Sequence, residues 1–259
     1  MTAESPDAPR ICLAIPFYSN IDYLRAALRS LRAQTDPQWT AIVVDDASPE
    51  QDAADMVALL GDRRVRYVRN EHNLGIAANF NRCLVLAAAN AEIVTVFHAD
   101  DELEPSYVSA VRRAHRAFPA AACVAPRVKV IDSNGRSTRT LADSVKRLLW
   151  PRKLPAALVG DPGLARLMHG LFFYCPAVSY RVDLLPVLRF DGRWRQVMDL
   201  DLYARVLLGG GTIVVVPERV YRYRRHAATM TAQNSRSLVR LDEEVAISRE
   251  VMVAARGKE

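Results

Sequence analysis

The chain has 259 residues, of which half are hydrophobic and a quarter are charged, and its formal net charge is +6. This composition is ordinary for a soluble globular protein and allows a substantial core. No stretch reaches the roughly 18 consecutive apolar residues of a membrane span. The positive balance favours anionic partners, namely nucleic acid, nucleotides or an acidic membrane surface, without choosing among them.

The N-terminal residues and the cysteines both indicate a cytoplasmic protein. The first ten residues lack the basic start and the apolar core of a signal peptide. Cys12, Cys83, Cys123 and Cys175 are far apart and form no C-x-x-C pair. We therefore expect reduced cysteines that lie mostly in the core.

Residues 11–97 alternate between runs typical of buried strands and runs with helical spacing. The apolar run Ile11–Ile15, closed by Pro16, predicts a strand covered on both faces. Asn20 is a candidate N-cap of the helix that follows, and Gly61 is a candidate stop of the second helix. The expected order is strand 11–15, helix 21–34, strand 40–46, helix 50–61, strand 65–70, helix 76–90 and strand 93–97. This alternation predicts a mostly parallel α/β sheet with helices on both faces.

After about residue 120 the periodicity weakens, although elements can still be assigned. The assignments are a strand or two at 122–132, a strand feeding a short helix at 175–188, a helix at 197–211, a strand at 212–226 and a helix at 237–259. Residues 137–170 carry several prolines and no clear period. We expect them to form a mobile or variable segment with a short helix or two.

The strands of the first half end in polar or acidic residues. Pro16-Phe17-Tyr18 follows the first strand, Asp45-Asp46 the second, Asn70 the third and Asp100-Asp101 the fourth. Ligands of open α/β sheets bind outside the carboxyl ends of the strands. We therefore expect these side chains to line one binding site.

Asp100 and Asp101 directly follow a buried strand. Two hard oxygen donors suit Mg²⁺ or Mn²⁺, which bind carboxylates together with substrate phosphates. The alternative is that Asp100 caps a helix beginning near Glu104-Pro105 while Asp101 is solvated. Asp45 or Asp46 would accept a hydrogen bond from a ribose or base. The glycine motifs of dinucleotide-binding and P-loop proteins are missing from the sequence.

Asp199 and Asp201 lie two positions apart on a predicted helix. One of them can then face a cleft while the other is solvated. A carboxylate at the cleft could act as a general base. The alternative is a charge that pairs with the helix dipole.

The segment Tyr221–Thr231 mixes aromatic and basic residues. Its arginines could neutralise a diphosphate, and His226 could bind a metal or a phosphate. The alternative is a basic surface loop. The segment resembles a nucleic-acid-binding surface only weakly, and we expect no nucleic-acid partner.

Taken together, these segments resemble the inverting glycosyltransferases of family 2, which have the GT-A fold. The segments are "ICLAIPFYSNIDYLRAALRSLRAQTDPQWTAIVVDDASPE", "RYVRNEHNLGIAANFNRCLVLAAANAEIVTVFHADDELEP", "MDLDLYARVLLGG" and "YRYRRHAAT". They are similar, in order, to the family patterns P-x-Y-N with V-V-D-D-x-S, D-x-D-D-x-x-x-P, E-D-x-D-L-x-x-R and Y-R-x-H-x-x-S. The resemblance is dense over residues 10–120 and thinner over 195–231.

The resemblance implies transfer of a sugar from a nucleotide-diphospho-sugar to a hydroxyl acceptor, with a divalent cation, Mn²⁺ or Mg²⁺. It favours a UDP-sugar, with dTDP- and GDP-sugars as alternatives, and a glycan, lipid-linked or small-molecule acceptor. It implies Asp199 as the catalytic base of a single inverting displacement. The implied metal ligands are Asp101, Asp100 and His226. The implied donor-binding residues are Pro16, Tyr18, Asp45, Asp46, Asn73, Asn81, Asp100, Arg224 and Arg225.

The same resemblance implies one GT-A domain in two halves. Residues 1–120 would bind the donor, residues 121–233 would bind the acceptor and carry the base, and residues 234–259 would form a C-terminal helix. The acceptor side would be built from residues 137–195. The basic cluster there could meet an anionic lipid-linked acceptor or the inner face of a membrane, or it could be a plain solvated surface.

Three positions depart from the family patterns. His98 stands where the first aspartate of D-x-D-D is usual, Ser19 separates Tyr18 from Asn20, and Met198 replaces a glutamate before Asp199. These departures leave a catalytically weakened nucleotide-sugar-binding protein as an alternative. A nucleotidyltransferase is a third hypothesis, and the segment "PFYSN" argues against it because a glycine-rich basic loop is expected there.

Overall fold

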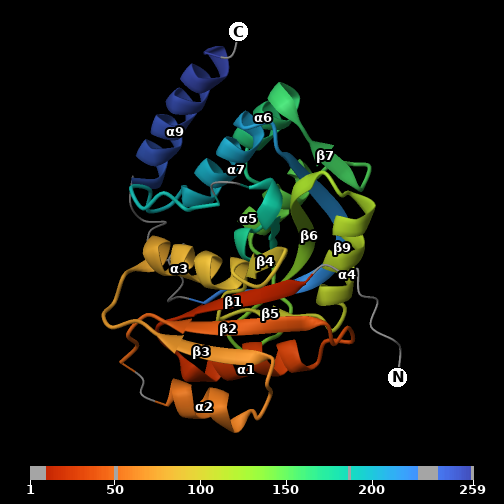
Figure 1. The fold of residues 1–259 in the computed structure, drawn as a ribbon. Coiled ribbons are helices and arrows are strands. Elements are labelled where there is room, and N and C mark those ends of the chain that lie inside the picture. The colour runs from red at the N-terminus through yellow and green to blue at the C-terminus, as the bar shows by residue number, and fades with distance from the viewer. Residues whose placement is uncertain (1–9, 50–51, 186–187, 227–238, 258–259) are drawn as a thin grey trace.

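In the computed structural model, residues 10–49, 52–185, 188–226 and 239–257 are described. The first half alternates strands and helices, as predicted (Figure 1). Its elements are β1 (Ile11–Phe17), α1 (Ile21–Arg32), β2 (Trp39–Asp45), α2 (Ala53–Leu59), β3 (Val65–Arg69), α3 (Ile76–Ala88) and β4 (Ile93–Val96). β1 pairs in parallel with both β2 and β4, and β2 pairs in parallel with β3. The predicted parallel sheet is confirmed.

The predicted helix cap at Asn20 and the predicted helix stop at Gly61 are confirmed, whereas the predicted strand end before Pro16 is not. The side chain of Asn20 accepts a hydrogen bond from the backbone of Tyr23 and so caps α1. Gly61 follows α2 with a left-handed φ of 60°. The prediction that the first strand stops at Ile15 is wrong. Pairing with β4 ends at Ala14, so the missing N–H of Pro16 faces a side where no neighbouring strand needs it.

The second half adds five strands to the same sheet, within the described part of the chain. Its elements are β5 (Glu102–Leu103), α4 (Tyr107–Ala117), β6 (Ala121–Ile131), α5 (Leu141–Leu149), β7 (Ala156–Leu158), α6 (Gly160–Met168), β8 (Ser179–Arg181), α7 (Met198–Leu208), β9 (Thr212–Arg224) and α9 (Val239–Arg256), with 3₁₀ turns at Cys175–Ala177 and Val182–Leu184. The strand order is β3-β2-β1-β4-β8-β6-β9-β5, and β7 pairs with β9. Because β8 lies between β4 and β6, one continuous sheet joins the two halves.

Residues 137–170 were expected to form a mobile or variable segment with a short helix or two. Two short helices, α5 and α6, are present, and the strand β7 between them was not predicted. The helix α5 begins with a capping box, in which Thr140 and Asp143 each bond the other's backbone N–H. Pro151 and Pro155 fall between α5 and β7, and Pro162 falls in the first turn of α6, where a helix tolerates proline.

Alternate residues of the strands face two hydrophobic clusters, one on each side of the sheet. On one side Ala14 and Val94 pack with α3, α6, α7 and α9. On the other side Leu13 and Ile93 pack with α1, α2 and α4. Figure 1 shows α3 and α1 on opposite faces of the strands β1–β3. This double cover explains the nearly continuous apolar runs of β1, β2 and β4.

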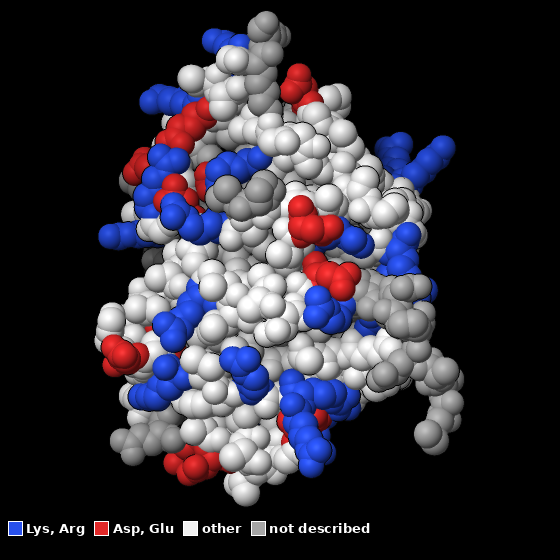
Figure 2. Space-filling view, viewed as in Figure 1, with Lys and Arg blue, Asp and Glu red and all other residues white. Residues whose placement is uncertain are grey.

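The four cysteines are free, and three of them are buried, as expected. No helix among the described residues combines the length and the apolarity needed to cross a bilayer. On the face drawn in Figure 2, basic and acidic side chains are interspersed rather than gathered into one patch.

Candidate active site

The carboxyl ends of β1 to β4 meet at one edge of the sheet, and polar side chains meet there. The buried carboxylate of Asp46 accepts hydrogen bonds from Asn70 Nδ2 at 2.7 Å and from the backbone N–H groups of Leu74 and Gly75 at 2.8 and 3.0 Å. Asp46 therefore ties the end of β3 and the turn before α3 to the end of β2. Its sequence-predicted role toward a ribose or base would come in addition to this positioning role.

Asp45 is even more fully enclosed, because its side chain is not exposed at all. It forms an ion pair with Arg69 at 2.7 Å and accepts hydrogen bonds from the hydroxyl of Tyr67 and the backbone N–H of Ser48. Each of these donors belongs to β3 or to the loop after β2. Among the two aspartates, Asp46 lies closer to the turn that precedes α3.

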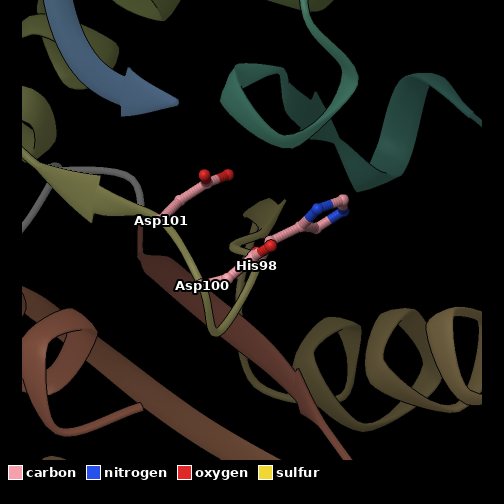
Figure 3. A group of neighbouring side chains, drawn as sticks. All are labelled: His98, Asp100 and Asp101. Atoms are coloured by element: carbon pink, nitrogen blue, oxygen red, sulfur yellow. The ribbon is translucent and has the colours of Figure 1, made fainter. Parts of the chain in front are cut away.

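The loop between β4 and β5 carries His98, Asp100 and Asp101, and Figure 3 shows their side chains leaving this one loop. One ligand atom from each of the three side chains lies within 4.8 Å of the others. The sequence alternative, in which Asp100 caps a helix near Glu104-Pro105, is wrong. The two-residue strand β5 intervenes, and α4 begins only at Tyr107, after Ser106.

Asp101 is anchored to β9 although 120 residues separate it from that strand. Its two carboxylate oxygens accept hydrogen bonds from Tyr221 Oη at 2.8 Å and from the backbone N–H of Arg224 at 2.7 Å. The residue is 1% exposed, so it is not the solvated aspartate of the alternative interpretation. Burial, and then the neighbouring charge of Asp100, raise the pKa of Asp101 well above its ordinary value.

Within this group, His98 has a buried ring nitrogen, Nε2, that makes no hydrogen bond among the described residues. Burial lowers the pKa of His98, against the opposing charge of Asp100, so the imidazole is neutral and offers a lone pair. A divalent cation would pair with this nitrogen and would relieve the repulsion between the two aspartates. The residues present therefore fit a cation bound by one imidazole nitrogen and carboxylate oxygens.

This ligand set predicts a metal preference that can be reversed at His98. In the H98D variant, the affinity for Mg²⁺ should rise relative to the affinity for Mn²⁺, because Mg²⁺ prefers oxygen ligands to imidazole. In H98F, the affinity for Mn²⁺ should fall by about tenfold, as expected on loss of a metal-ligand contact. Phenylalanine keeps the contact with Phe80, whose ring lies 5.1 Å from the imidazole. Calorimetric titration of each metal measures both effects, and an unchanged Mn²⁺ affinity in H98F would remove His98 from the ligand set.

The residues after β9 enclose Asp100 and Asp101. His226 Nε2 lies 3.0 Å from Asp100 Oδ2, next to the group of three rather than within it. Burial raises the pKa of Asp100, but the hydrogen bond with His226 is among the interactions that bring this pKa below its usual value. The Arg224 guanidinium donates to the backbone carbonyl of Asp100 at 2.7 Å and forms an ion pair with Glu102. The positive charge of Arg224 therefore lies at the loop, although its N–H groups already donate hydrogen bonds to other residues of the protein.

Arg225 points to the opposite side of β9. It forms an ion pair with Asp143 at the start of α5, and Asp143 also accepts a hydrogen bond from Tyr174 at 2.7 Å. The predicted contact of Arg225 with a diphosphate would require it to share or leave this pair. Residues 227–231 of the predicted loop lie outside the described residues.

Asp199 is on the first turn of α7 and is partly exposed. Its Oδ1 accepts a hydrogen bond from the backbone N–H of Leu200 at 2.8 Å. Burial raises the pKa of Asp199, and the positive charge of Lys146 opposes this shift. In turn, burial lowers the pKa of Lys146 to about 8, and the charge of Asp199 opposes that change. A carboxylate with a raised pKa is suited to accept a proton from a bound hydroxyl.

Asp201 was the second candidate for the base, or else a solvated residue, and neither description fits its surroundings. It is 6% exposed and forms an ion pair with Arg205 at 2.7 Å, one turn further along α7. Arg205 also donates to the backbone carbonyl of Arg189. Asp201 therefore fixes α7 to the preceding segment.

The other predicted donor-binding residues have mixed positions. Pro16 lies in β1, and Tyr18 follows the strand and is 49% exposed at the edge of the sheet. Asn73 accepts a hydrogen bond from the backbone N–H of Gly75 at 2.8 Å, within the turn that Asp46 holds. The Asn81 side chain is committed to the backbone N–H and carbonyl of Phe190, at 2.8 and 2.9 Å.

Sequence reasoning missed three residues that organise this site. Lys146 was grouped with other basic residues, and Tyr221 was treated as one of several aromatics. Asp143 was not singled out. Side chains two positions apart along a strand share a face, so Tyr221, Tyr223 and Arg225 are expected on one face and Arg224 on the other. This period was the available signal for the orientation of Tyr221. No signal in the sequence placed Lys146 beside Asp199, because α5 and α7 are far apart along the chain.

The fold and this edge define a class: a GT-A-type α/β protein with an acidic loop after β4 and a carboxylate at the start of α7. A structural alignment with S. aureus TarS 1-349 in complex with UDP-GlcNAc covers 95% of this chain, with a TM-score of 0.71 and 19% identity. The chain also aligns over 95% of its length with the mannosyltransferase PcManGT from Pyrobaculum calidifontis in complex with GDP-Man and Mn²⁺, with a TM-score of 0.69 and 18% identity. These similarities support the fold.

The sequence model described as "Glycosyl transferase family 2" matches residues 12–175, which is more than half of the chain. The chain therefore belongs to glycosyl transferase family 2, as the motifs predicted. The succinoglycan biosynthesis protein ExoO of Rhizobium meliloti is 29% identical over 216 residues. The chain spans 60% of the length of ExoO, 66% of the TarS chain and 65% of the PcManGT chain.

Proposed function

We propose that this family 2 glycosyltransferase moves a sugar from a nucleotide-diphospho-sugar to a hydroxyl acceptor, with inversion at the anomeric carbon and with a bound divalent cation. Two features of the described chain carry the proposal. One is the cation-competent loop His98–Asp101, and the other is the partly exposed carboxylate of Asp199. A single inverting displacement needs an activated leaving group and a base on the acceptor side.

The chemistry assigned to the chain is a proton transfer at Asp199. Asp199 Oδ accepts the proton of the acceptor hydroxyl while that oxygen bonds to the anomeric carbon, and the bond from this carbon to the nucleoside diphosphate breaks. The electron pair of the broken bond leaves with the diphosphate. A cation held by Asp101, Asp100 and His98 would supply positive charge for that leaving group. Arg224 and His226 lie beside the loop and add positive or hydrogen-bonding groups there.

The donor side of the proposal is the turn held by Asp46, together with Tyr18 and Asn73 at the same edge of the sheet. PcManGT binds GDP-Man and Mn²⁺, and TarS binds UDP-GlcNAc, so both nucleotides occur among proteins of this fold. We infer a UDP-sugar as the first donor to test, and GDP- and dTDP-sugars as the next. The named relative ExoO acts in succinoglycan biosynthesis, which supports a role in glycan assembly.

The acceptor side of the proposal is the region of α5, β7 and α6. The charge of Asp199 opposes the lowering of the pKa of Lys146 on α5, and this supports an acceptor site near α5. We retain residues 1–120 as the donor half, residues 121–233 as the acceptor half, and residues 234–259 as a C-terminal helix. A cytoplasmic location stays part of the proposal.

Lys146 also predicts the pH dependence of transfer. Asp199 must be ionised to act as a base, so activity should fall as the pH drops through its raised pKa. In K146M the opposing positive charge is lost, the pKa of Asp199 rises further, and the acidic limb should move up by about one pH unit. The pH profile of kcat/KM measures the shift, with K153M as the matched control at an exposed lysine. Coincident acidic limbs in K146M and the wild type would contradict the assignment of Asp199.

Binding of the donor can be tested without knowledge of the acceptor. Calorimetric titration of UDP-, GDP- and dTDP-sugars should give binding of at least one donor that is lost when EDTA removes the cation. Equal binding with and without the cation would contradict a metal-bridged diphosphate. Tight cation-dependent binding without any turnover would instead identify a nucleotide-sugar-binding protein that has lost transfer.

A further inference from the structure

On helix α5, Asp143 and Lys146 face inward with Leu149, whereas three other apolar residues face outward. Asp143 is buried, and Lys146 is half-buried with its Nζ bonded to the backbone carbonyl of Phe173 at 3.0 Å. On the opposite face, Leu141 and Leu148 are 83% and 84% exposed, and Val145 is 48% exposed. These three residues lie at positions i, i+4 and i+7, so they form one stripe along the helix.

The orientation of α5 is fixed by specific bonds. Asp143 forms the capping box with Thr140, and it pairs with Arg225 of β9 and with Tyr174. Rotating the helix to bury the apolar stripe would break each of these contacts and would leave Asp143 without its ion pair. The outward apolar stripe is therefore a property of the folded protein.

Basic residues precede, interrupt and follow this stripe in the sequence. Between residues 136 and 153 the sequence has Arg136, Arg139, Lys146, Arg147, Arg152 and Lys153. Asp143, which is already paired with Arg225, is the acidic residue in this range. An amphipathic helix with an apolar face and flanking lysines and arginines is the arrangement that binds the surface of an anionic bilayer.

Beside α5 lies a cavity of about 190 Å³ in which several of these cations meet. Arg127 of β6 and Arg219 of β9 are partners in adjacent strands, and Arg147 of α5 lines the same cavity. In the described part of the chain, none of these three arginines pairs with a carboxylate. Burial, and then the charges of Arg219 and Arg147, lower the pKa of Arg127, which reflects the crowding of like charges. The Arg127 guanidinium also lies 5.0 Å from the centre of the Trp150 ring.

We propose that α5 is an interfacial helix that places the protein on an anionic membrane, with Leu141, Val145 and Leu148 in the bilayer surface and a lipid phosphate in the Arg127–Arg147–Arg219 cavity. Asp143 also lines the cavity, but it is paired with Arg225, and guanidinium groups that pair with no carboxylate are suited to bind phosphate oxygens. The attachment itself does not depend on the proposed transfer.

The test is co-sedimentation with vesicles of phosphatidylcholine alone and with vesicles in which about a third of the lipid is phosphatidylglycerol. The full chain should bind the anionic vesicles and not the neutral ones. The L141S/L148S variant should bind at least about tenfold more weakly, because it removes apolar area from the bilayer surface. The matched control is L59S/V85S, whose leucine and valine are 87% and 70% exposed on other helices, and it should bind like the wild type.

A second pair of variants tests the cavity. R147Q/R219Q should weaken binding to the anionic vesicles, whereas R113Q/R116Q, which removes two exposed arginines of α4, should have a much smaller effect. Calorimetric titration with inorganic phosphate separates the two sources of phosphate. Binding of free phosphate without binding of anionic vesicles would overturn the membrane proposal, as would L141S/L148S that sediments like the wild type. Donor binding measured in solution should be unchanged in L141S/L148S, so failure of this proposal and failure of the transferase proposal are distinguishable.

Discussion

The D199N variant should lose at least about 100-fold in transfer rate while it still folds and binds the donor, because removal of a general base typically costs this much or more. Asparagine keeps an oxygen that can accept the hydrogen bond from the Leu200 N–H, so the first turn of α7 should be preserved. Asparagine cannot take the proton of the acceptor hydroxyl. Steady-state rates and calorimetric donor affinities, measured on the same preparation, separate the two effects.

The D201N variant is the matched control, since it changes the same residue type on the same helix. Its expected effect is on stability rather than on rate. Asp201 is buried against Arg205, and loss of a partly buried ion pair should cost about 1–3 kcal/mol of the free energy of unfolding. If D201N abolished transfer and D199N retained it, the base would have been assigned to the wrong carboxylate.

The D101N variant should lose cation-dependent donor binding by at least about tenfold, because it removes the negative charge of a buried ligand whose place in the loop is fixed. The amide can still accept the hydrogen bond from the backbone N–H of Arg224. Calorimetric titration of the donor, with Mn²⁺ and with EDTA, measures the loss. The difference between these two conditions should nearly vanish in D101N.

Tyr221 provides the control for that experiment. Y221F removes the hydroxyl that bonds Asp101 and leaves the carboxylate in place, with a stability cost of about 1 kcal/mol for the lost hydrogen bond. Its cation-dependent binding should stay much closer to that of the wild type than the binding of D101N. Equal losses in the two variants would mean that Asp101 acts only by holding the loop to β9.

The first half of the fold could be predicted because local patterns and global structure agree there. The strands β1, β2 and β4 are apolar on both faces, the helices α1 and α3 have apolar stripes, and the caps at Asn20 and Gly61 are local signals. The end of β1 was predicted too early because Pro16 was read as a stop. Its place in the strand depends on where pairing with β4 ends, which no local pattern reveals.

The second half was predictable in its long elements and not in its short ones. The strand β9 and the helix α7 have clear periods, whereas α5 has an inverted amphipathic pattern whose polar residues point inward. Its orientation depends on Asp143 meeting Arg225, a contact between positions 82 residues apart. Sequence patterns that assume an apolar inner face cannot place such a helix.

The candidate site shows the same division. Strand ends predicted that Asp46, Asn70 and Asp101 would lie at one edge, and Asp46 does bond Asn70 there. What they could not predict is which polar groups are already bound within the chain. Asn81 is committed to Phe190 and Arg225 to Asp143, whereas the buried nitrogen of His98 is left without a partner among the described residues.

The most direct test of the central proposal is release of nucleoside diphosphate from a panel of UDP-, GDP- and dTDP-sugars, with Mn²⁺ and after its removal by EDTA. We expect release from at least one donor that requires the cation and that D199N and D101N each suppress. Absence of release from every donor, alongside tight cation-dependent donor binding, would contradict a transferase and leave a nucleotide-sugar-binding protein.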